Sequence, residues 1–299
     1  MRLLTPAGAR LYDPRTLPVN STVSTQRGNT KSVGVSFSRG RDYFRAYLDE
    51  GPLFAAIVRG VECLLLQTAK PFTQPALDLG CGDGFFASLI ADEPFFAGID
   101  PSAAALRRAR GWRAHRELIQ ANGDAMPVPS NFFNTVLANS VLEHIAELDG
   151  TLEEISRVLR PDGRLLITAP SHRFAEMLLG STVLRQVGAL RLSRAYGDWF
   201  NRHSRHFHTD DAETWIARLE RHGFIVERCH YYLSAAALRA FDLAHYLSVP
   251  RWVSRQLTGK WVAVPHPISN RVWEHWLRRF YDAQPVQEGP YLFLEARRR

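Results

Sequence analysis

A glycine-rich turn after a buried strand constrains the fold of this chain more than any other feature. The stretch ALDLGCGDGFFA, residues 76–87, places Gly80, Gly82 and Gly84 on alternate positions directly after an apolar run. Glycine adopts positive φ at little cost, and it leaves room for a close neighbour where a Cβ would clash. The sequence therefore predicts a tight strand-to-helix turn on which another backbone or a ligand lies.

Strands and helices alternate on both sides of this turn. Helices are expected at about residues 83–91, after Pro101 and at about 150–160, and a further helix is expected to begin at Thr209 as its N-cap. This alternation is typical of a mostly parallel sheet with helices on both faces, a doubly wound α/β fold. Its seven expected strands are ALDLG (76–80), FFAGID (95–100), LIQANGD (118–124), TVLANS (135–140), GRLLITAP (163–170), FIVERCHYY (224–232) and YLFLEAR (291–297).

Positive charge is concentrated at the two ends of the chain. The formal net charge is +7, residues 1–40 hold six Arg or Lys residues against one acid, and the chain ends in ARRR. Charged ends on a near-neutral body are more typical of solvated tails than of a nucleic-acid groove. The sequence disfavours nucleic acid as a partner, but a protein that modifies or binds nucleic acid through these ends stays open as an alternative, which a steep salt dependence of binding would reveal.

The sequence predicts neither a membrane span nor a disulfide framework. The three cysteines are odd in number and lie far apart. The most apolar early run, residues 53–66, contains Arg59 and Glu62 and is shorter than the ~20 residues of a spanning helix. We expect a cytoplasmic protein, with peripheral attachment to a membrane surface as an open alternative.

Two acids at strand ends indicate which ligand the glycine turn would meet. A dinucleotide-binding turn has the pattern G-x-G-x-x-G, but Phe85 stands where its third glycine would fall. Asp100 ends the second expected strand, where a carboxylate can accept hydrogen bonds from both hydroxyls of a ribose. Asp124 ends the third, where it could accept from an exocyclic amine such as that of adenine. Together they indicate an adenosine that carries something other than a pyrophosphate.

The chain resembles the class I S-adenosylmethionine-dependent methyltransferases, in particular their small-molecule subgroup. The resemblance covers residues 76–170, in family order and spacing, and resumes at HFHTDDAETWIARLERHGFIV. The segments that carry it are ALDLGCGDGFFA, FFAGIDPS, ANGDAMPVPSNFFNTVLANSVLEHI and RVLRPDGRLLITAP. It implies a Rossmann-like sheet and S-adenosylmethionine as the cofactor, with S-adenosylhomocysteine as the product.

The resemblance also implies a role for individual residues. Asp78 would hold the methionyl ammonium, Asp100 the ribose, and Asp124 the adenine amine, while Asn139 would border the methionyl amine and the methyl group. The remaining implied cofactor residues are Gly80, Cys81 and Gly82 in the turn, Pro101 against the adenine ring, and Ala125 or Met126, whose backbone would meet a ring nitrogen. A capping or turn role is the structural alternative for Asp78 and Asn139.

Composition and the resemblance together suggest how the chain is organised. Residues 1–38 lack apolar periodicity, so we expect an irregular basic segment followed by one methyltransferase domain at 39–299. Within that domain we expect N-terminal helices at 39–70, a cofactor-binding core at 71–170, and substrate or cap insertions at 171–208 and 233–289. In the second insertion, Trp273, Trp276, Leu277 and Phe280 form a stripe that either packs as a cap or meets a membrane or substrate.

Methyl transfer requires alignment of a nucleophile with the methyl group, and a base where the nucleophile carries a proton. His144 and His206 are the candidate bases, although each can instead serve only a structural role. His206 lies in NRHSRHFH, a histidine-rich run for which the sequence shows no matching acid or cysteine, so we expect no metal.

The acceptor is the least determined part of the prediction. Residues 171–208 contain six arginines against two acids, which favours an anionic acceptor unless these arginines only cover a solvated helix face. We expect methylation, preferably of oxygen, on a small-molecule, sugar-linked or lipid-linked acceptor. A catalytically silent scaffold of the same fold is a further alternative, and the intact Asp78, Asp100 and Asp124 argue against it. The oligomeric state and the identity of the acceptor stay open.

Overall fold

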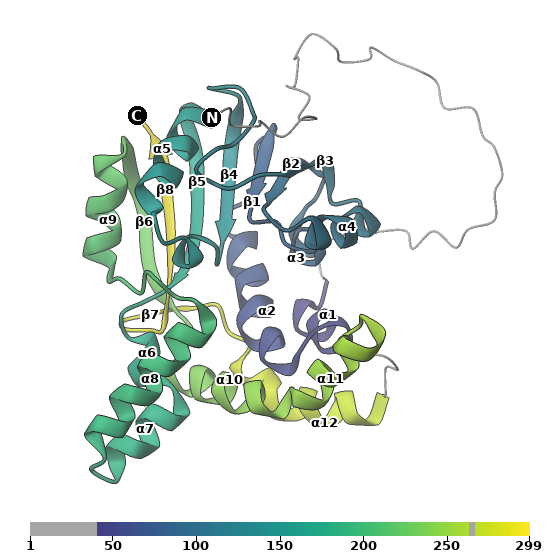
Figure 1. Ribbon diagram of the computed structural model, residues 1–299, viewed down its shortest axis with the longest axis vertical. Helices are drawn as coiled ribbons and strands as arrows, with labels where there is room; N and C mark the ends of the chain where they lie inside the picture. Colours follow the sequence, from purple (N-terminus) through teal and green to yellow (C-terminus); the bar gives the residue numbers. More distant parts are fainter. Residues whose placement is uncertain (1–40, 263–266) are drawn as a thin grey trace, which may run out of the picture.

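The structure, a computed structural model, describes residues 41–262 and 267–299; the expected basic segment at 1–38 lies outside them. One eight-stranded sheet has the order β3-β2-β1-β4-β5-β8-β6-β7 (Figure 1). Strands β1 to β5 pair in parallel, and β8 runs antiparallel to both β5 and β6. The strands are β1 (Ala76–Leu79), β2 (Phe95–Asp100), β3 (His115–Gln120), β4 (Phe133–Asn139), β5 (Leu159–Pro170), β6 (Phe224–Tyr232), β7 (Pro285–Val286) and β8 (Tyr291–Arg298).

The doubly wound α/β fold is confirmed, with one strand more than expected. The additional strand, β7, has two residues and pairs with the end of β6 through Tyr231 and Val286. It lies at the edge of the sheet, where a proline is tolerated because no ladder N–H is needed from it. Such a short strand has no alternation pattern that a sequence could show.

Helices cover both faces of the sheet and extend beyond one of its ends. The helix expected to begin at Thr209 begins instead at Ala212, because the Asp211 side chain accepts from the N–H of Thr214 and makes Asp211 the N-cap. The helices are α1 (Tyr43–Glu50), α2 (Leu53–Gln67), α3 (Phe85–Ile90), α4 (Ala103–Trp112), α5 (Leu148–Val158), α6 (Phe174–Met177), α7 (Leu179–Gln186), α8 (Leu190–Ser204), α9 (Ala212–Arg221), α10 (Ala235–Leu247), α11 (Val249–Thr258) and α12 (Pro267–Leu277), with 3₁₀ turns η1 (Leu142–His144) and η2 (Arg278–Phe280).

Alternate residues of the central strands pack into two separate cores. In β5, Leu165 and Ile167 join the core under α5 and α9, whereas Leu166 joins the core under α2 and α10. In β8, Leu292 and Phe293 divide in the same way. Successive side chains of a strand point to opposite faces, so strands buried on both sides read as continuous apolar runs. This is why the central strands were recognisable from the sequence.

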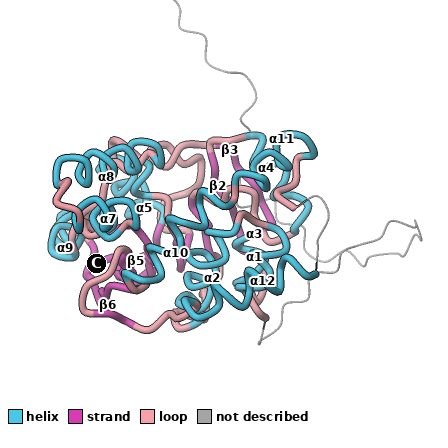
Figure 2. The backbone as a smooth tube through the Cα atoms, turned by 90° about the horizontal axis from the view of Figure 1, so that it is seen from below, coloured by secondary structure: helices cyan, strands magenta, loops and turns pink. Residues whose placement is uncertain are grey.

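The segments after β5 and β6 build a helical layer at the carboxyl ends of the parallel strands. Helices α6 to α8 follow β5 and α10 to α12 follow β6, and Figure 2 shows them spread across that end of the molecule. Tyr196 of α8 donates to Asp242 of α10 at 2.7 Å, which ties the two groups of helices together. Of the tryptophan stripe, Leu277 is fully buried, and Trp273, Trp276 and Phe280 pack against the core under α2 and α10.

Candidate functional site

The three glycines after β1 all adopt left-handed backbone conformations, but they do so for different reasons. A Cβ on Gly80 would lie 2.4 Å from a methyl group of Val141, and one on Gly84 would lie 2.9 Å from Ala109. A Cβ on Gly82 would have no atom of the described residues within 4 Å. Gly80 and Gly84 therefore serve packing, while Gly82 faces open space at the turn.

Asp100, at the end of β2, holds this turn in place. Its Oδ2 accepts from the N–H of Gly82 at 3.0 Å, and its Oδ1 accepts from the N–H of Ser102 at 2.8 Å. Asp100, Pro101 and Asp124 also line one cavity of about 480 Å³. The residues predicted to meet a ribose and an adenine are thus brought together in one cavity.

Asp78 lines a second, larger cavity of about 610 Å³, together with Gly82, Cys81 and Asn139. Its Oδ2 lies 2.8 Å from Nε2 of the buried His115 on β3. The imidazole reaches Asp78 across Gly98, where a Cβ would lie 2.7 Å from the ring. The sequence did not indicate this pair, because His115 is an isolated histidine at the start of a strand.

The two cavities meet at the carboxyl ends of β1 and β4. Gly80 and Ser140 line both of them. The larger cavity also has aromatic walls and four cations, two of which come from α11 and the residues that follow it. Its further lining includes Tyr47, Phe54, Arg59, Phe85, Phe86, Arg108, Trp112, Arg255, Lys260 and Trp261, with Glu50 and Asp83 as additional acids.

Ala125 and Met126 do not line these cavities. The Met126 N–H donates to the Glu154 carboxylate of α5 at 2.9 Å, and its carbonyl accepts from Arg157 at 2.9 Å. The Ala125 N–H donates to the carbonyl of Asn122 at 3.3 Å. Their predicted contact with a ring nitrogen stays a prediction, and in this conformation both N–H groups are already used.

A buried carboxylate beneath the larger cavity organises the end of β4. Glu62 of α2 is fully buried, and Asn139, a predicted cofactor residue, donates to its Oε2 at 2.8 Å. Arg59 donates to the same oxygen at 2.7 Å. Ser140 and Tyr232 donate to Oε1 at 2.9 and 3.1 Å. Sequence reasoning missed this role of Glu62, although one acid on an otherwise buried apolar helix was the signal that could have revealed it.

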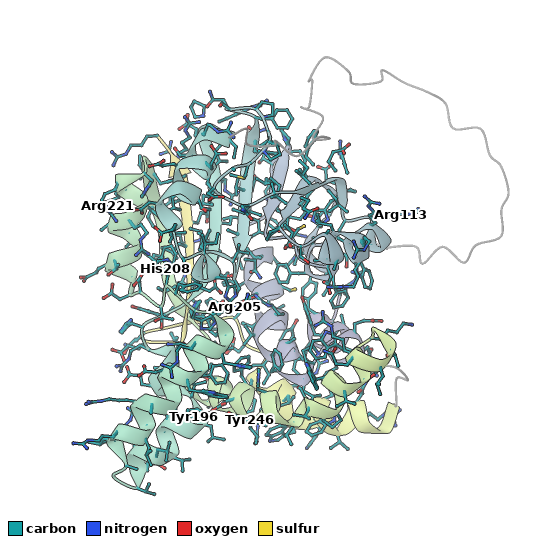
Figure 3. All side chains as sticks on the ribbon, in the orientation of Figure 1. Arg113, Tyr196, Arg205, His208, Arg221 and Tyr246 are labelled. Carbon is teal, nitrogen blue, oxygen red and sulfur yellow. The ribbon has the colours of Figure 1, made fainter. Side chains whose placement is uncertain are left out.

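The two candidate bases lie side by side, and the structure supplies the acid that the sequence did not show beside them. The rings of His144 and His206 are 5.4 Å apart, and Glu143 Oε1 is 3.8 Å from His144 Nε2. Figure 3 shows Arg205, whose carbonyl accepts from His144 Nδ1, at the carboxyl end of the sheet. Burial, reinforced by His144 and Arg59, lowers the pKa of His206 to about 3. Burial lowers the pKa of His144 as well. A general base works best with a pKa near the working pH, so the role predicted for these two histidines stays a prediction.

None of the six arginines of residues 171–208 lines either of the two cavities at the glycine turn, although the carbonyl of Arg205 contacts His144. Arg173, Arg185 and Arg194 line small cavities among α6, α7 and α8. At the chain's end, Arg297 pairs with Glu227 and Asp162 at 2.8 and 2.7 Å. The cations at the candidate site are instead Arg59, Arg108, Arg255 and Lys260, which the sequence did not single out.

Comparisons with known proteins agree with this geometry. Residues 77–167 match a family described as a methyltransferase domain. Over 109 residues the chain is 36% identical to the malonyl-(acyl-carrier protein) O-methyltransferase of Legionella pneumophila, an alignment that covers 34% of this chain and 38% of that protein. Over 128 residues it is 31% identical to the ubiquinone/menaquinone biosynthesis C-methyltransferase of Hahella chejuensis, an alignment that covers 41% of this chain and 50% of that protein. The chain thus spans half or less of the length of these two relatives.

A solved structure extends the likeness to the whole fold. A SAM-dependent methyltransferase of Thermotoga maritima superposes with a TM-score of 0.51 at 13% identity, covering 83% of this chain and 92% of that one. At this identity the likeness shows the fold alone. The matched domain, the relatives and the fold agree on one family. Residues 77–167 form a class I S-adenosylmethionine-dependent methyltransferase domain.

Proposed function

We propose that this protein transfers a methyl group from S-adenosylmethionine to an oxygen of a small, anionic and partly apolar acceptor, such as a lipid-linked one. The observation that carries the proposal is the pair of cavities that meet at Gly80 and Ser140. One holds the two acids suited to an adenosine, and the other holds Asp78 with aromatic and cationic walls. Cofactor and acceptor can therefore enter from separate sides and meet at the end of β4.

The residues present fit such a cofactor. Gly82 leaves open space beside its Cα, so a ligand can approach the backbone of the turn. Asp100 has lone pairs to spare on a carboxylate already oriented by two N–H groups, and Asp124 is exposed toward the same cavity. Because His115 occupies Oδ2 of Asp78, Oδ1 is the atom that would accept from the methionyl ammonium.

The bound cofactor supplies a methyl group on a positively charged sulfur, which is already electrophilic. The protein has to orient the acceptor and keep water away from it. The Glu62 network fixes Asn139 and Ser140, so the floor where the two cavities meet is rigid. Tyr47, Phe85 and Trp112 provide apolar walls in the larger cavity.

S-adenosylhomocysteine should bind in the micromolar range, and Asp100→Ala should weaken it by about 1–3 kcal/mol, because hydrogen-bond donors on the ligand lose a charged acceptor. Isothermal titration calorimetry measures both. Asp92→Ala is the matched control, since Asp92 is an exposed acid that pairs with Lys70 at 2.7 Å away from both cavities. NAD should not compete, and tight NAD binding without any response to S-adenosylhomocysteine would overturn the assignment.

The acceptor class is proposed from the walls of the larger cavity and from α11 at its edge. Arg255 and Lys260 line the cavity. On the same segment Trp252 and Leu257 are 53% and 80% exposed. An aromatic and apolar helix face with adjacent cations is typical of helices that lie at a membrane surface. No helix among the described residues is both long and apolar enough to cross a membrane.

If α11 meets a lipid surface, the protein should float with vesicles that contain anionic lipid and bind weakly to neutral ones. The double variant Trp252→Ser, Leu257→Ser should lose flotation, because it removes the apolar contacts while keeping the cations. Val187→Ser is the control, as Val187 is 71% exposed at the end of α7. Absence of association with anionic vesicles would remove the lipid surface from the proposal and leave a soluble anionic acceptor.

A further inference from the structure

The side chains of Glu143, His144 and His206 converge beside the smaller cavity. One potential ligand atom from each lies within 4.8 Å of the other two. Glu143 and His144 belong to η1 after β4, whereas His206 follows α8, so the cluster is formed only by the fold. His144 also lines the cavity that contains Asp100 and Asp124.

The hydrogen bonds of the two imidazoles leave one nitrogen of each available. His144 Nδ1 lies 3.1 Å from the carbonyl of Arg205, and His206 Nδ1 lies 3.3 Å from Oδ1 of Asn201. With Nδ1–H donating to these oxygens, both Nε2 atoms carry a lone pair. Metal-binding histidines are characteristically oriented in this way, by an oxygen that accepts from the second ring N–H.

Glu143 provides an independent indication that something is missing from the cluster. The residue is 1% exposed, and its Oε2 has no hydrogen-bond partner among the described residues. A buried carboxylate oxygen without a partner is costly, so such a group is normally paired or coordinates a metal. Arg59, whose charge acts on Glu143, is itself bound to Glu62 at 2.7 Å.

The geometry points to a binding site for one divalent transition-metal ion, formed by Glu143, His144 and His206. Two imidazoles and one carboxylate suit zinc or ferrous iron better than magnesium, which prefers oxygen ligands. Three protein ligands leave coordination positions open for water or for an acceptor oxygen. His144 is exposed, which gives the ion a path from solvent. Any use of the ion in methyl transfer rests on the function proposed above, but the site itself does not.

Cobalt is a suitable probe, because Co²⁺ bound by nitrogen and oxygen ligands absorbs visible light and Zn²⁺ can displace it. The full chain, stripped with a chelator, should bind one Co²⁺ with a visible band that Zn²⁺ removes. Changes to the groups that orient metal ligands typically weaken metal binding 10- to 100-fold, and Asn201→Ala should fall within that range. Loss of a ligand itself should weaken Co²⁺ binding at least as much, in each of the variants His144→Ala, His206→Ala and Glu143→Gln. His203→Ala is the matched control, an exposed histidine on the same segment that stacks on Trp199.

Measurements of thermal stability and of cofactor binding separate failure of the metal site from failure of the proposed function. Thermal unfolding should show that Zn²⁺ raises the midpoint of the wild type and of His203→Ala, but not that of the three ligand variants. Absence of Co²⁺ binding by the folded wild type, or unchanged binding by all three variants, would overturn the site. S-adenosylhomocysteine is titrated in parallel. If S-adenosylhomocysteine binds and Co²⁺ does not, only the metal site fails. If Co²⁺ binds and S-adenosylhomocysteine does not, only the methyltransferase proposal fails.

Discussion

Glu62→Ala should lower the free energy of unfolding by about 3–5 kcal/mol, the range measured when one partner of a buried ion pair is removed. The substitution leaves Arg59 without its carboxylate and three further donors, from Asn139, Ser140 and Tyr232, without an acceptor. Arg59 is 33% exposed in its side chain and can turn to water, so the lower end of this range is expected. Urea unfolding measures the change.

Two further variants separate this network from a general effect on the core. Tyr232→Phe removes one donor and should cost only about 0.5–1.5 kcal/mol. Glu295 is another mostly buried acid, and it pairs with Arg164 and Arg228 outside both cavities. Glu295→Gln removes its charge, so this variant should lower the free energy of unfolding while S-adenosylhomocysteine affinity is retained. A folded Glu62→Ala should lose affinity as well, because Asn139 and Ser140 are no longer fixed. Equal urea midpoints for Glu62→Ala and wild type would contradict the role given to this network.

The elements that the sequence predicted correctly are those whose signal is local. Strands β1 and β2 read as apolar runs between turn residues, and Gly51 and Pro52 lie between the two N-terminal helices α1 and α2. Thr209 and Asp211 both have side-chain oxygens that can cap a helix N-terminus. Only the hydrogen bond from the Thr214 N–H shows that Asp211 is the N-cap. Competing caps two residues apart cannot be distinguished by residue type.

The site could be predicted where its residues lie in the glycine turn or at the end of an expected strand. Asp100 carries a recognisable position at a strand end, and the structure places it against Gly82. Glu62 and Asn139 are 77 residues apart, and His206 follows His144 after one intervening strand and four helices. Contacts of this kind depend on how helices dock onto the sheet, so a pattern along the chain does not report them. For the same reason, the sequence suggested that the arginines of residues 171–208 favour an anionic acceptor, although none of them lines either cavity.

The glycine turn allows the packing requirement and the ligand requirement to be measured separately. Gly80→Ala should cost about 1–2 kcal/mol for a side chain at φ +67°, and about 1–3 kcal/mol more because its Cβ would overlap Val141. Gly82→Ala, at φ +56° with open space around it, should bear only the first of these costs. Urea unfolding should therefore rank Gly80→Ala as clearly less stable than Gly82→Ala.

Affinity for S-adenosylhomocysteine should separate the same two variants in a second way. A methyl group on Gly82 projects into space where the cofactor is proposed to lie, so the folded Gly82→Ala protein should bind it much more weakly than its small loss of stability suggests. Adding Val141→Ala to Gly80→Ala removes the methyl groups that the new Cβ would meet and should recover part of the lost stability, whereas no change at Val141 should restore binding to Gly82→Ala. If Gly82→Ala binds S-adenosylhomocysteine as the wild type does, the open space at this turn is not where the cofactor lies, and the three glycines serve only the turn and its packing.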